Sequence, residues 1–397
     1  MKKSILSIVA IASLVFASCS LSDDDNTPVT GGDVTPQNLA GNLTSDLTLK
    51  SGIAHNLTGA LLVKDGATLT IEAGTTINAL AGGTDVYILV EKGGKLIADG
   101  TAANPIKFTS SATNPKAGDW GGIILNGKAP LSRQTGAESN AATEVKNSIL
   151  FGGSVAADNS GIINYVILEY TGARIDDEAE HNGLTLNGVG SGTTLSNIAI
   201  LNGDDDGIEF FGGTVNASNI LVVNAKDDMF DFTQGYVGTC TNLYGIREAG
   251  YSAVTKDPRG IEADGNLDGK STSDINQSNF TVNGVTIINN NAVKTTNGAE
   301  SGGMTDGIKI RRGATATITN AYLALGSGAK FDDVVDLQDK RGDANDKTSI
   351  TVNANTANGL DIKDIKNTVS GGATIKLTAA TSGGADKSVF TWTGYKF

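Results

Sequence analysis

The stretch LSNIAILNGDDDGIEFFGGTVNASNILVVNAKDDMFDFTQG, residues 195–235, contains the same pattern twice. Asn197 and Asn219 open two short apolar runs, Asp206 and Asp228 open the runs that follow, and both pairs are 22 residues apart. A fixed period of this size, carried by short apolar runs between Asn, Asp and Gly, is typical of a β-solenoid. One repeat cannot bury its own apolar face, whereas stacked copies can. The stretch therefore predicts an all-β fold, a right-handed parallel β-helix with N- and C-terminal caps.

Asparagine marks the start of one strand in each predicted coil. Asn tolerates the left-handed backbone conformation, and its amide can bond to a neighbouring coil, so we expect a structural ladder inside a turn. The same register places Cys240 in the core as a small apolar side chain rather than as a reactive thiol. The asparagines in question are Asn164, Asn197, Asn219, Asn242, Asn283 and Asn320.

A second strand also recurs in each coil, and alternation along it separates inward from outward side chains. In the copy at 206–210 it directs Ile208 and Phe210 inward and Glu209 outward. Neighbouring strands lie about 4.8 Å apart, so successive carboxylates in the outward column repel one another unless a cation compensates them. The predicted outward column is Thr185, Glu209, Asp231, Glu262, Lys309 and Asp336.

Insertions fall in one slot of the repeat, at residues 171–181, 247–258 and 289–305. They flank two coils whose connections are short, so we expect a trough between them. Clustered carboxylates suit Ca²⁺, which takes six to eight oxygens, and paired carboxylates suit glycoside hydrolysis. The alternative is that these residues only form turns and inter-coil hydrogen bonds. The predicted trough residues are Asp205, Asp206, Glu209, Asp227, Asp228, Asp231, Arg259 and Glu262.

A separate short motif, DGNLDG at 264–269, resembles the first half of a calcium-binding loop. Alternate oxygens in such a loop wrap the ion, and a glycine makes the bend. Its last acidic residue comes one position early and no helical pattern flanks it, so we do not expect an EF-hand. A calcium-bound surface loop and a plain Asx turn remain alternatives. The candidate metal ligands are Asp264, Asn266, Asp268 and Asp274.

Charge and composition exclude some partners. The chain has 397 residues and a formal net charge of −13, which argues against nucleic acid or anionic lipid as a partner. Only two histidines are present, which leaves little for a zinc site or a Ser-His-Asp triad. In polygalacturonases of this fold, the histidine is followed by Gly. Here neither His55 nor His181 is followed by Gly.

The N-terminus resembles a bacterial lipoprotein signal. Two lysines and an apolar run over 5–16 lead to Cys19, so residues 1–18 are expected to be removed and Cys19 lipidated. The acidic residues at 23–25 resemble the signal that sends Bacteroidetes lipoproteins to the outer face of the outer membrane. The alternative is an ordinary cleaved signal with an acidic tail. Residues 19–40 are then a flexible tether to the membrane.

Residues 41–397 are predicted to form the β-helix domain, with its C-terminal cap at about 365–397. Trp392 and Phe397 are expected to pack in that cap, because an open terminal coil is an edge that pairs with other chains.

Residues 40–397 resemble the surface-exposed parallel β-helix lipoproteins of Bacteroidetes, through stretches such as DDGIEFFGGTVNA and DDMFDFTQG. The resemblance implies a cell-surface protein of polysaccharide-lyase-like fold. Our leading hypothesis is non-enzymatic binding of a glycan, a cation such as Ca²⁺ or an outer-membrane partner protein through the trough. The alternatives are a calcium-dependent polysaccharide lyase or glycoside hydrolase, in which Arg259, Arg311 or Arg312 imitates a lyase base, and a structural surface protein without a ligand.

Overall fold

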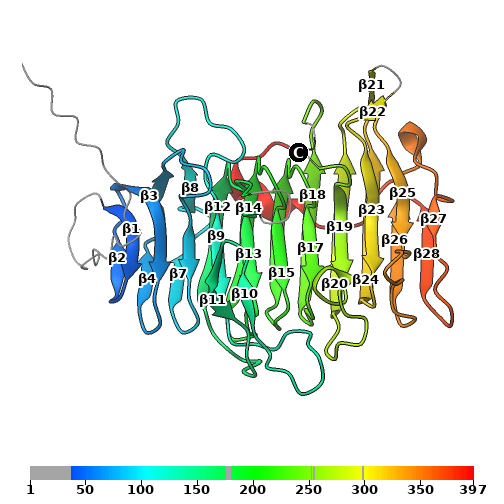
Figure 1. Cartoon of the computed structure of the whole chain (residues 1–397). Helices are drawn as coiled ribbons and strands as arrows, with labels where there is room; N and C mark the ends of the chain where they lie inside the picture. The colour runs from blue at the N-terminus through cyan, green and yellow to red at the C-terminus, as the bar shows by residue number, and fades with distance from the viewer. Residues whose placement is uncertain (1–36, 176–179, 252, 254, 297–298) are drawn as a thin grey trace, which may run out of the picture.

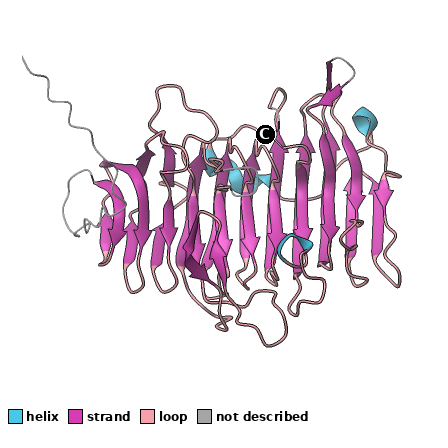
Figure 2. Cartoon of the chain, viewed as in Figure 1, coloured by secondary structure: helices cyan, strands magenta, loops and turns pink. Residues whose placement is uncertain are grey.

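A computed structural model describes residues 37–175, 180–251, 253, 255–296 and 299–397. The described chain is almost entirely strand, wound into a right-handed parallel β-helix as predicted (Figures 1 and 2). The coils stack side by side along one axis, so each strand pairs with the strand of the next coil (Figure 1). Three parallel faces result, which we call A, B and C.

Faces A and B share long strands that bend in the middle. Face A contains β2 (Leu47–Leu49), β4 (Thr68–Ile71), β7 (Lys95–Asp99) and the first parts of the shared strands. Face B contains the first parts of β1 (Asn38–Leu43) and β3 (Ala54–Val63), then β5 (Thr76–Ala79), β8 (Ile106–Ser110) and the second parts of the shared strands. The shared strands are β12 (Gly161–Glu169), β14 (Thr194–Leu201), β16 (Ala217–Val223), β18 (Thr239–Arg247), β20 (Asn279–Asn289), β24 (Thr315–Leu325), β26 (Ser349–Ala354) and β28 (Thr374–Ala379).

Face C is built from short strands, one in each coil. It begins with the second parts of β1 and β3. It continues through β6 (Ile88–Val90), β9 (Ile123–Asn126), β13 (Leu184–Asn187), β15 (Ile208–Phe211), β17 (Phe230–Thr233), β19 (Arg259–Asp264), β23 (Met304–Arg311), β25 (Phe331–Asp336) and β27 (Ile365–Lys366).

The remaining elements lie in the connections. Two antiparallel hairpins are β10 (Ala141–Thr143) with β11 (Lys146–Phe151), and β21 (Lys294–Thr296) with β22 (Ala299–Ser301). Short 3₁₀ helices span η1 (Leu267–Gly269), η2 (Ala357–Gly359) and η3 (Lys387–Thr393). Among the described residues, no helix is long and apolar enough to cross a membrane.

The core runs along the axis between the three faces and is filled by the inward side chains of every coil. Phe210 and Phe232, one coil apart, stack with ring centroids 5.1 Å apart, and Phe280 stacks on Phe232 at 4.4 Å. Cys240 is fully buried, and burial raises the pKa of its thiol to about 12. The prediction of a core cysteine is confirmed.

The predicted asparagine ladder forms the bend between faces A and B. Asn197, Asn219 and Asn242 have φ of 53°, 56° and 62°, a conformation that Asn adopts more readily than most residues. The side-chain amide of Asn219 donates to Asn197 (3.0 Å), and that of Asn242 donates to Asn219 (3.0 Å). These three coils therefore turn at the same point. For Asn164 and Asn283 the predicted register is wrong by one residue, because Tyr165 (φ 49°) and Gly284 (φ 76°) hold the bend in their coils.

The first strand of the β-helix begins slightly before the expected domain start at residue 41. Strand β1 begins at Asn38, because Leu39 is buried and pairs with Leu57, so the fold starts inside the predicted tether. The signal segment and Cys19 lie outside the described residues.

The prediction that Trp392 and Phe397 close the terminal coil is wrong. The chain turns back after β28, and η3 packs on the outer surface of face B in the middle of the solenoid (red in Figure 1). The outward side chains there are apolar, so covering them removes apolar surface from water. Phe390 is buried among them, Trp392 contacts Tyr165, and Phe397 contacts Tyr244.

Candidate functional site: an acidic trough on face C

The outward column of face C matches the prediction residue for residue. Strand pairing places Thr185 beside Glu209, Glu209 beside Asp231, and Asp231 beside Glu262. Beyond these, Glu262 pairs with Lys309 and Lys309 with Asp336. Before Thr185 the same column is apolar, through Leu62, Leu89 and Ile124 in consecutive register. The column therefore changes from apolar to acidic at Thr185.

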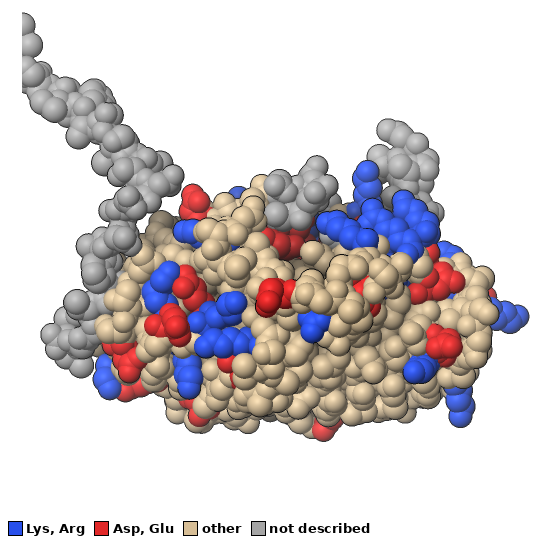
Figure 3. Space-filling view, turned by 60° about the horizontal axis from the view of Figure 1, so that its bottom comes forward, with Lys and Arg blue, Asp and Glu red and all other residues tan. Residues whose placement is uncertain are grey.

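Loops on both sides turn the acidic part of the column into a trough of about 660 Å³, its open mouth included. In Figure 3, small groups of acidic side chains are spread over the visible face, some of them near its middle, and a larger group of basic side chains lies to the right of these. Ten of the fifteen lining residues are Asp or Glu, and the lining surface as a whole is almost wholly polar. The lining residues are Glu144, Glu180, Asn182, Asp205, Asp206, Glu209, Phe211, Asp227, Asp228, Asp231, Thr233, Glu262, Asp264, Leu267 and Arg311.

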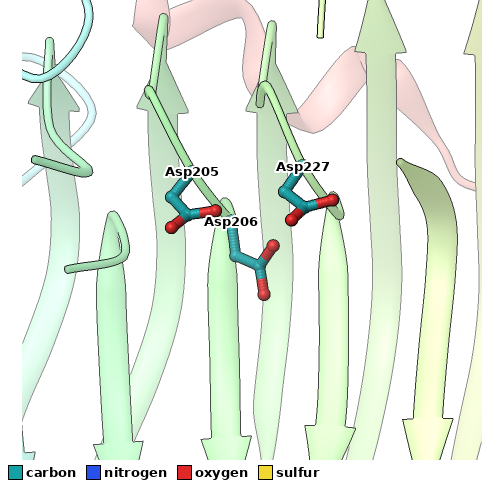
Figure 4. A group of neighbouring side chains, drawn as sticks. All are labelled: Asp205, Asp206 and Asp227. Carbon is teal, nitrogen blue, oxygen red and sulfur yellow. The ribbon is translucent and has the colours of Figure 1, made fainter. Parts of the chain in front are cut away.

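Three carboxylates converge where the short connections between faces B and C enter face C. Asp205 and Asp206 precede β15, Asp227 precedes β17 one coil later, and one oxygen of each lies within 4.8 Å of the others. Figure 4 shows the three carboxylates directed toward a common space. Asp205 is only 3 % exposed, and its Oδ2 has no hydrogen-bond partner among the described residues. A buried carboxylate oxygen without a donor is costly unless a ligand supplies one.

Two further groups of carboxylates continue this arrangement along the trough. Asp206, Glu209 and Asp231 form one, and Asp228, Asp231 and Glu262 form the next, each within 4.8 Å. The groups share members, and Oδ1 of Asp231 also lacks a hydrogen-bond partner. The trough thus contains a continuous line of oxygens rather than one isolated pair.

The pKa values of these groups show that their charges are poorly compensated. Burial raises the pKa of Asp206, Glu209 and Asp231 well above the usual range, and neighbouring carboxylates raise it further. Burial and the same repulsion act on Asp205 and Asp228. Burial raises the pKa of Asp227 to about 6. A cation in the trough would offset both the cost of burying these charges and their mutual repulsion.

The second Asp of each repeat also has a structural role. Asp206 Oδ1 accepts a hydrogen bond from the backbone N–H of Asp228 (2.7 Å), and Asp228 Oδ1 accepts one from the backbone N–H of Arg259 (2.5 Å). The inter-coil hydrogen bonds considered from the sequence are therefore present, and each uses one oxygen of the carboxylate. Asp205 and Asp227 do not take part in this backbone ladder.

Arginines neutralise the ends of the trough. At one end Arg174 contacts Asp205 (2.7 Å) and Glu180 (3.5 Å). At the other, Arg259 contacts Glu262 (3.1 Å) and Asp306 (3.0 Å), while Arg311 pairs with Glu262 and with Asp264 (2.7 Å). Although burial disfavours the charged form, these carboxylates raise the pKa of Arg259 above its ordinary value.

The sequence missed part of the trough. Glu144 from hairpin β10–β11 and Glu180 from the loop after β12 join the predicted carboxylates. Asn182 donates to Glu209 (2.5 Å) and occupies the register position of Asp206 one coil earlier, a signal that the repeat contained. Arg259 was predicted to line the trough. It is not a lining residue but forms an ion pair with one of them, Glu262.

In the predicted calcium loop, the side chains of Asp264, Asn266 and Asp274 make contacts with other protein groups. Asp264 pairs with Arg311 and Arg312, Asn266 accepts from the backbone N–H of Ser271 (3.0 Å), and Asp274 accepts from Gln134. The side chain of Asp268 lies outside the described residues. Calcium binding in this loop stays a prediction, whereas Asp264 belongs to the trough lining.

The coils, the asparagine bend and the loop-flanked face C define a parallel β-helix protein with one elaborated lateral face. The family model described as "Pectate-lyase like beta helix domain" matches residues 41–395, and the chain belongs to this family. Searches of curated proteins and of solved structures found no match.

Proposed function

We propose that the trough binds divalent cations, Ca²⁺ in particular, and through them an acidic polysaccharide, without cleaving it. The observation that carries the proposal is the unpartnered Oδ2 of buried Asp205 beside Asp206 and Asp227. Ca²⁺ prefers oxygen ligands in a flexible arrangement and takes six to eight of them. Since these carboxylates supply only part of that number, sugar carboxylates and hydroxyls can complete the coordination.

The arginines argue against a lyase reaction. A lyase of this fold that uses an arginine base needs that side chain in its neutral form, so that it can accept a proton. Arg259 contacts Asp228, Glu262 and Asp306, and their negative charges stabilise its protonated form. The same reasoning applies to Arg311. Burial lowers its pKa, but the carboxylates of Glu262 and Asp264 outweigh this effect and raise it.

A glycoside hydrolase is the second candidate. Glycosidases pair an ionised carboxylate with a carboxylic acid whose pKa is raised. Burial raises the pKa of Glu209, and Asp206 and Asp231 lie next to it. This candidate predicts that new reducing ends appear when the protein is incubated with an acidic polysaccharide, whereas the binding proposal predicts none.

The cellular address is part of the proposal. The Lys-rich start, apolar run and Cys19 support a lipid-anchored protein, and the acidic residues at 23–25 support export to the outer-membrane surface. A cation-dependent glycan-binding face is suited to such a location.

Calorimetric titration of the protein with CaCl₂ tests the proposal. We expect saturable binding that the double variant Asp205→Asn/Asp227→Asn abolishes and that the control Asp85→Asn, an exposed acidic residue outside the trough lining, retains. The double variant is also expected to unfold at a higher temperature than wild type in chelator, because it removes buried charge repulsion. No binding at millimolar CaCl₂ would refute the proposal.

A further inference from the structure

A second hollow lies under hairpin β10–β11, next to the acidic end of the outward column. We infer that this hollow is a subsite for the acetamido group of an amino sugar. The inference deepens the proposed function, on which it rests for the polymer as a whole, because it specifies an acidic polysaccharide that contains N-acetylated sugars. The inference starts from the row of Thr185, where the outward column of face C changes from apolar to acidic side chains.

The hairpin covers the apolar part of the column. Val145 and Ile149 pack against a cluster formed by Leu62, Leu89 and Ile124 with Tyr87. Phe151, at the end of the hairpin, lies on Phe211 with ring centroids 6.4 Å apart. The covered region ends at the row of Thr185, where the carboxylates begin. A ligand at this junction meets an apolar wall on one side and the cation-binding line on the other.

The lining of the hollow combines apolar surface with an unused acceptor. The hollow measures about 410 Å³ with its open mouth included, and more of its lining is apolar than polar. Gln234 lines it, is only 6 % exposed, and its Oε1 has no hydrogen-bond partner among the described residues. The lining residues that the argument uses are Ala142, Val145, Phe151, Phe211, Leu267 and Gln234.

These features select one chemical group. The apolar wall suits a methyl group, and the buried acceptor of Gln234 requires an N–H or O–H donor. An acetamido group carries a methyl and an N–H on adjacent atoms of one planar unit. An O-acetyl or O-methyl group leaves Gln234 without a donor, and a free hydroxyl leaves the apolar wall without a partner.

The hollow and the trough are continuous. Glu144, Glu180, Phe211 and Leu267 line both. A sugar whose acetamido group fills the hollow therefore places its neighbours in the polymer along the carboxylate line. If those neighbours are uronates, a bound cation bridges them to the protein. The substrate class is thus an acidic polysaccharide in which N-acetylated amino sugars adjoin uronates.

Saturation-transfer NMR with methyl N-acetyl-glucosaminide tests the subsite without calcium. We expect the acetamido methyl to receive the strongest saturation. Ala142→Trp should abolish the signal by filling the hollow, and Ser148→Trp, an exposed residue of the same hairpin outside the lining, should retain it. No saturation of the acetamido methyl in wild type, or equal saturation in Ala142→Trp, overturns the inference.

Calorimetry in CaCl₂ then separates the subsite from the trough. An oligosaccharide of alternating glucuronate and N-acetylglucosamine should bind about tenfold tighter than its analogue with 2-O-acetylglucose in place of N-acetylglucosamine, since the ester has no N–H to donate to the buried acceptor. Gln234→Asn keeps a residue that tolerates the φ of 51° but withdraws the acceptor, and should remove this preference. Equal calcium-dependent binding of both forms refutes the subsite and leaves the proposed function intact. Calcium-independent saturation transfer without any binding of acidic oligosaccharides refutes the proposed function alone.

Discussion

Arg174 donates a hydrogen bond to Asp205 across 2.7 Å, from the loop after β12 to the turn before β15. Asp205 is one of the three carboxylates that converge in the trough, and Arg174 is the nearest cation to it. The guanidinium thus occupies the neighbourhood in which we propose that Ca²⁺ binds. Arg174 binds Oδ1 of Asp205 while Oδ2 is the oxygen without a partner, so under the proposal the guanidinium and the metal ion would share one carboxylate and repel each other.

Arg174→Gln is therefore expected to strengthen calcium binding. Removing one partly exposed positive charge near the ion changes its binding free energy by a few tenths to about 1 kcal/mol, or about two- to fivefold in affinity. Calorimetric titration measures the change. Lys107→Gln, which breaks the ion pair with Glu169 outside the trough, serves as the control and should leave the affinity unchanged. Weaker binding in Arg174→Gln would instead assign Arg174 a role in holding the trough open.

The stability of the calcium-free protein should fall as pH rises. Burial raises the pKa of Asp227 and Asp264 to about 6, above the ordinary value near 3.8, and the pKa values of Asp206 and Asp228 shift in the same direction. The folded protein then binds more protons than the unfolded chain, so the stabilisation is complete below about pH 4 and is lost through about pH 6 and above.

Thermal unfolding in chelator between pH 5 and pH 8 measures this dependence. The midpoint is expected to decrease across the range, and millimolar CaCl₂ is expected to reverse most of the decrease, because the ion stabilises the ionised carboxylates. A midpoint that rises with pH in chelator would show that the arginines already neutralise the trough.

The asparagine bend gives a test of the fold itself. Asn219→Ala loses the ladder hydrogen bonds and also places a Cβ-bearing residue without a polar side chain at φ 56°. Asn219→Gly loses the same hydrogen bonds without the steric cost. We expect Ala to destabilise the protein by about 1 kcal/mol more than Gly, measured by denaturant unfolding. Equal losses would mean that the hydrogen bonds alone determine the preference for Asn.

The C-terminal segment should stabilise the middle of the solenoid. Phe390→Ala removes a buried ring from the apolar cluster on face B, which is expected to cost about 3–5 kcal/mol. Hydrogen exchange should then accelerate in β14, β16 and β18, whose residues form that cluster. Leu377→Ala, in the last strand, is the matched variant and should accelerate exchange near β26 and β28 instead. Reversed patterns would contradict the observed packing.

The repeat made much of this structure predictable. Glu209 and Asp231 are 22 residues apart, which is one coil. Residues one coil apart lie side by side in neighbouring strands, so this spacing alone predicts their pairing. From it followed the outward column, the asparagine ladder and the position of Cys240. In a solenoid, the period of the sequence therefore tells directly which residues are in contact.

Segments without a period were the ones that sequence could not place. Hairpin β10–β11 and the C-terminal turn η3 each occur once, so no register relates them to the coils. Their docking sites nevertheless left a signal: Leu89 and Ile124 on face C, and Leu221 and Tyr244 on face B, are apolar at outward positions. Outward apolar residues in a solenoid strand indicate that another segment covers them.

The column of face C also sets how long the trough is. Each coil contributes a single outward residue, and successive coils advance by about 4.8 Å. Inserting or deleting a coil like that of residues 195–216 would lengthen or shorten the acidic line by one step while leaving the turns, the ladder and the core of the other coils unchanged. Under the proposed function, the length of polysaccharide that such a protein holds would depend on its number of repeats, and it would change in whole steps without a change of fold.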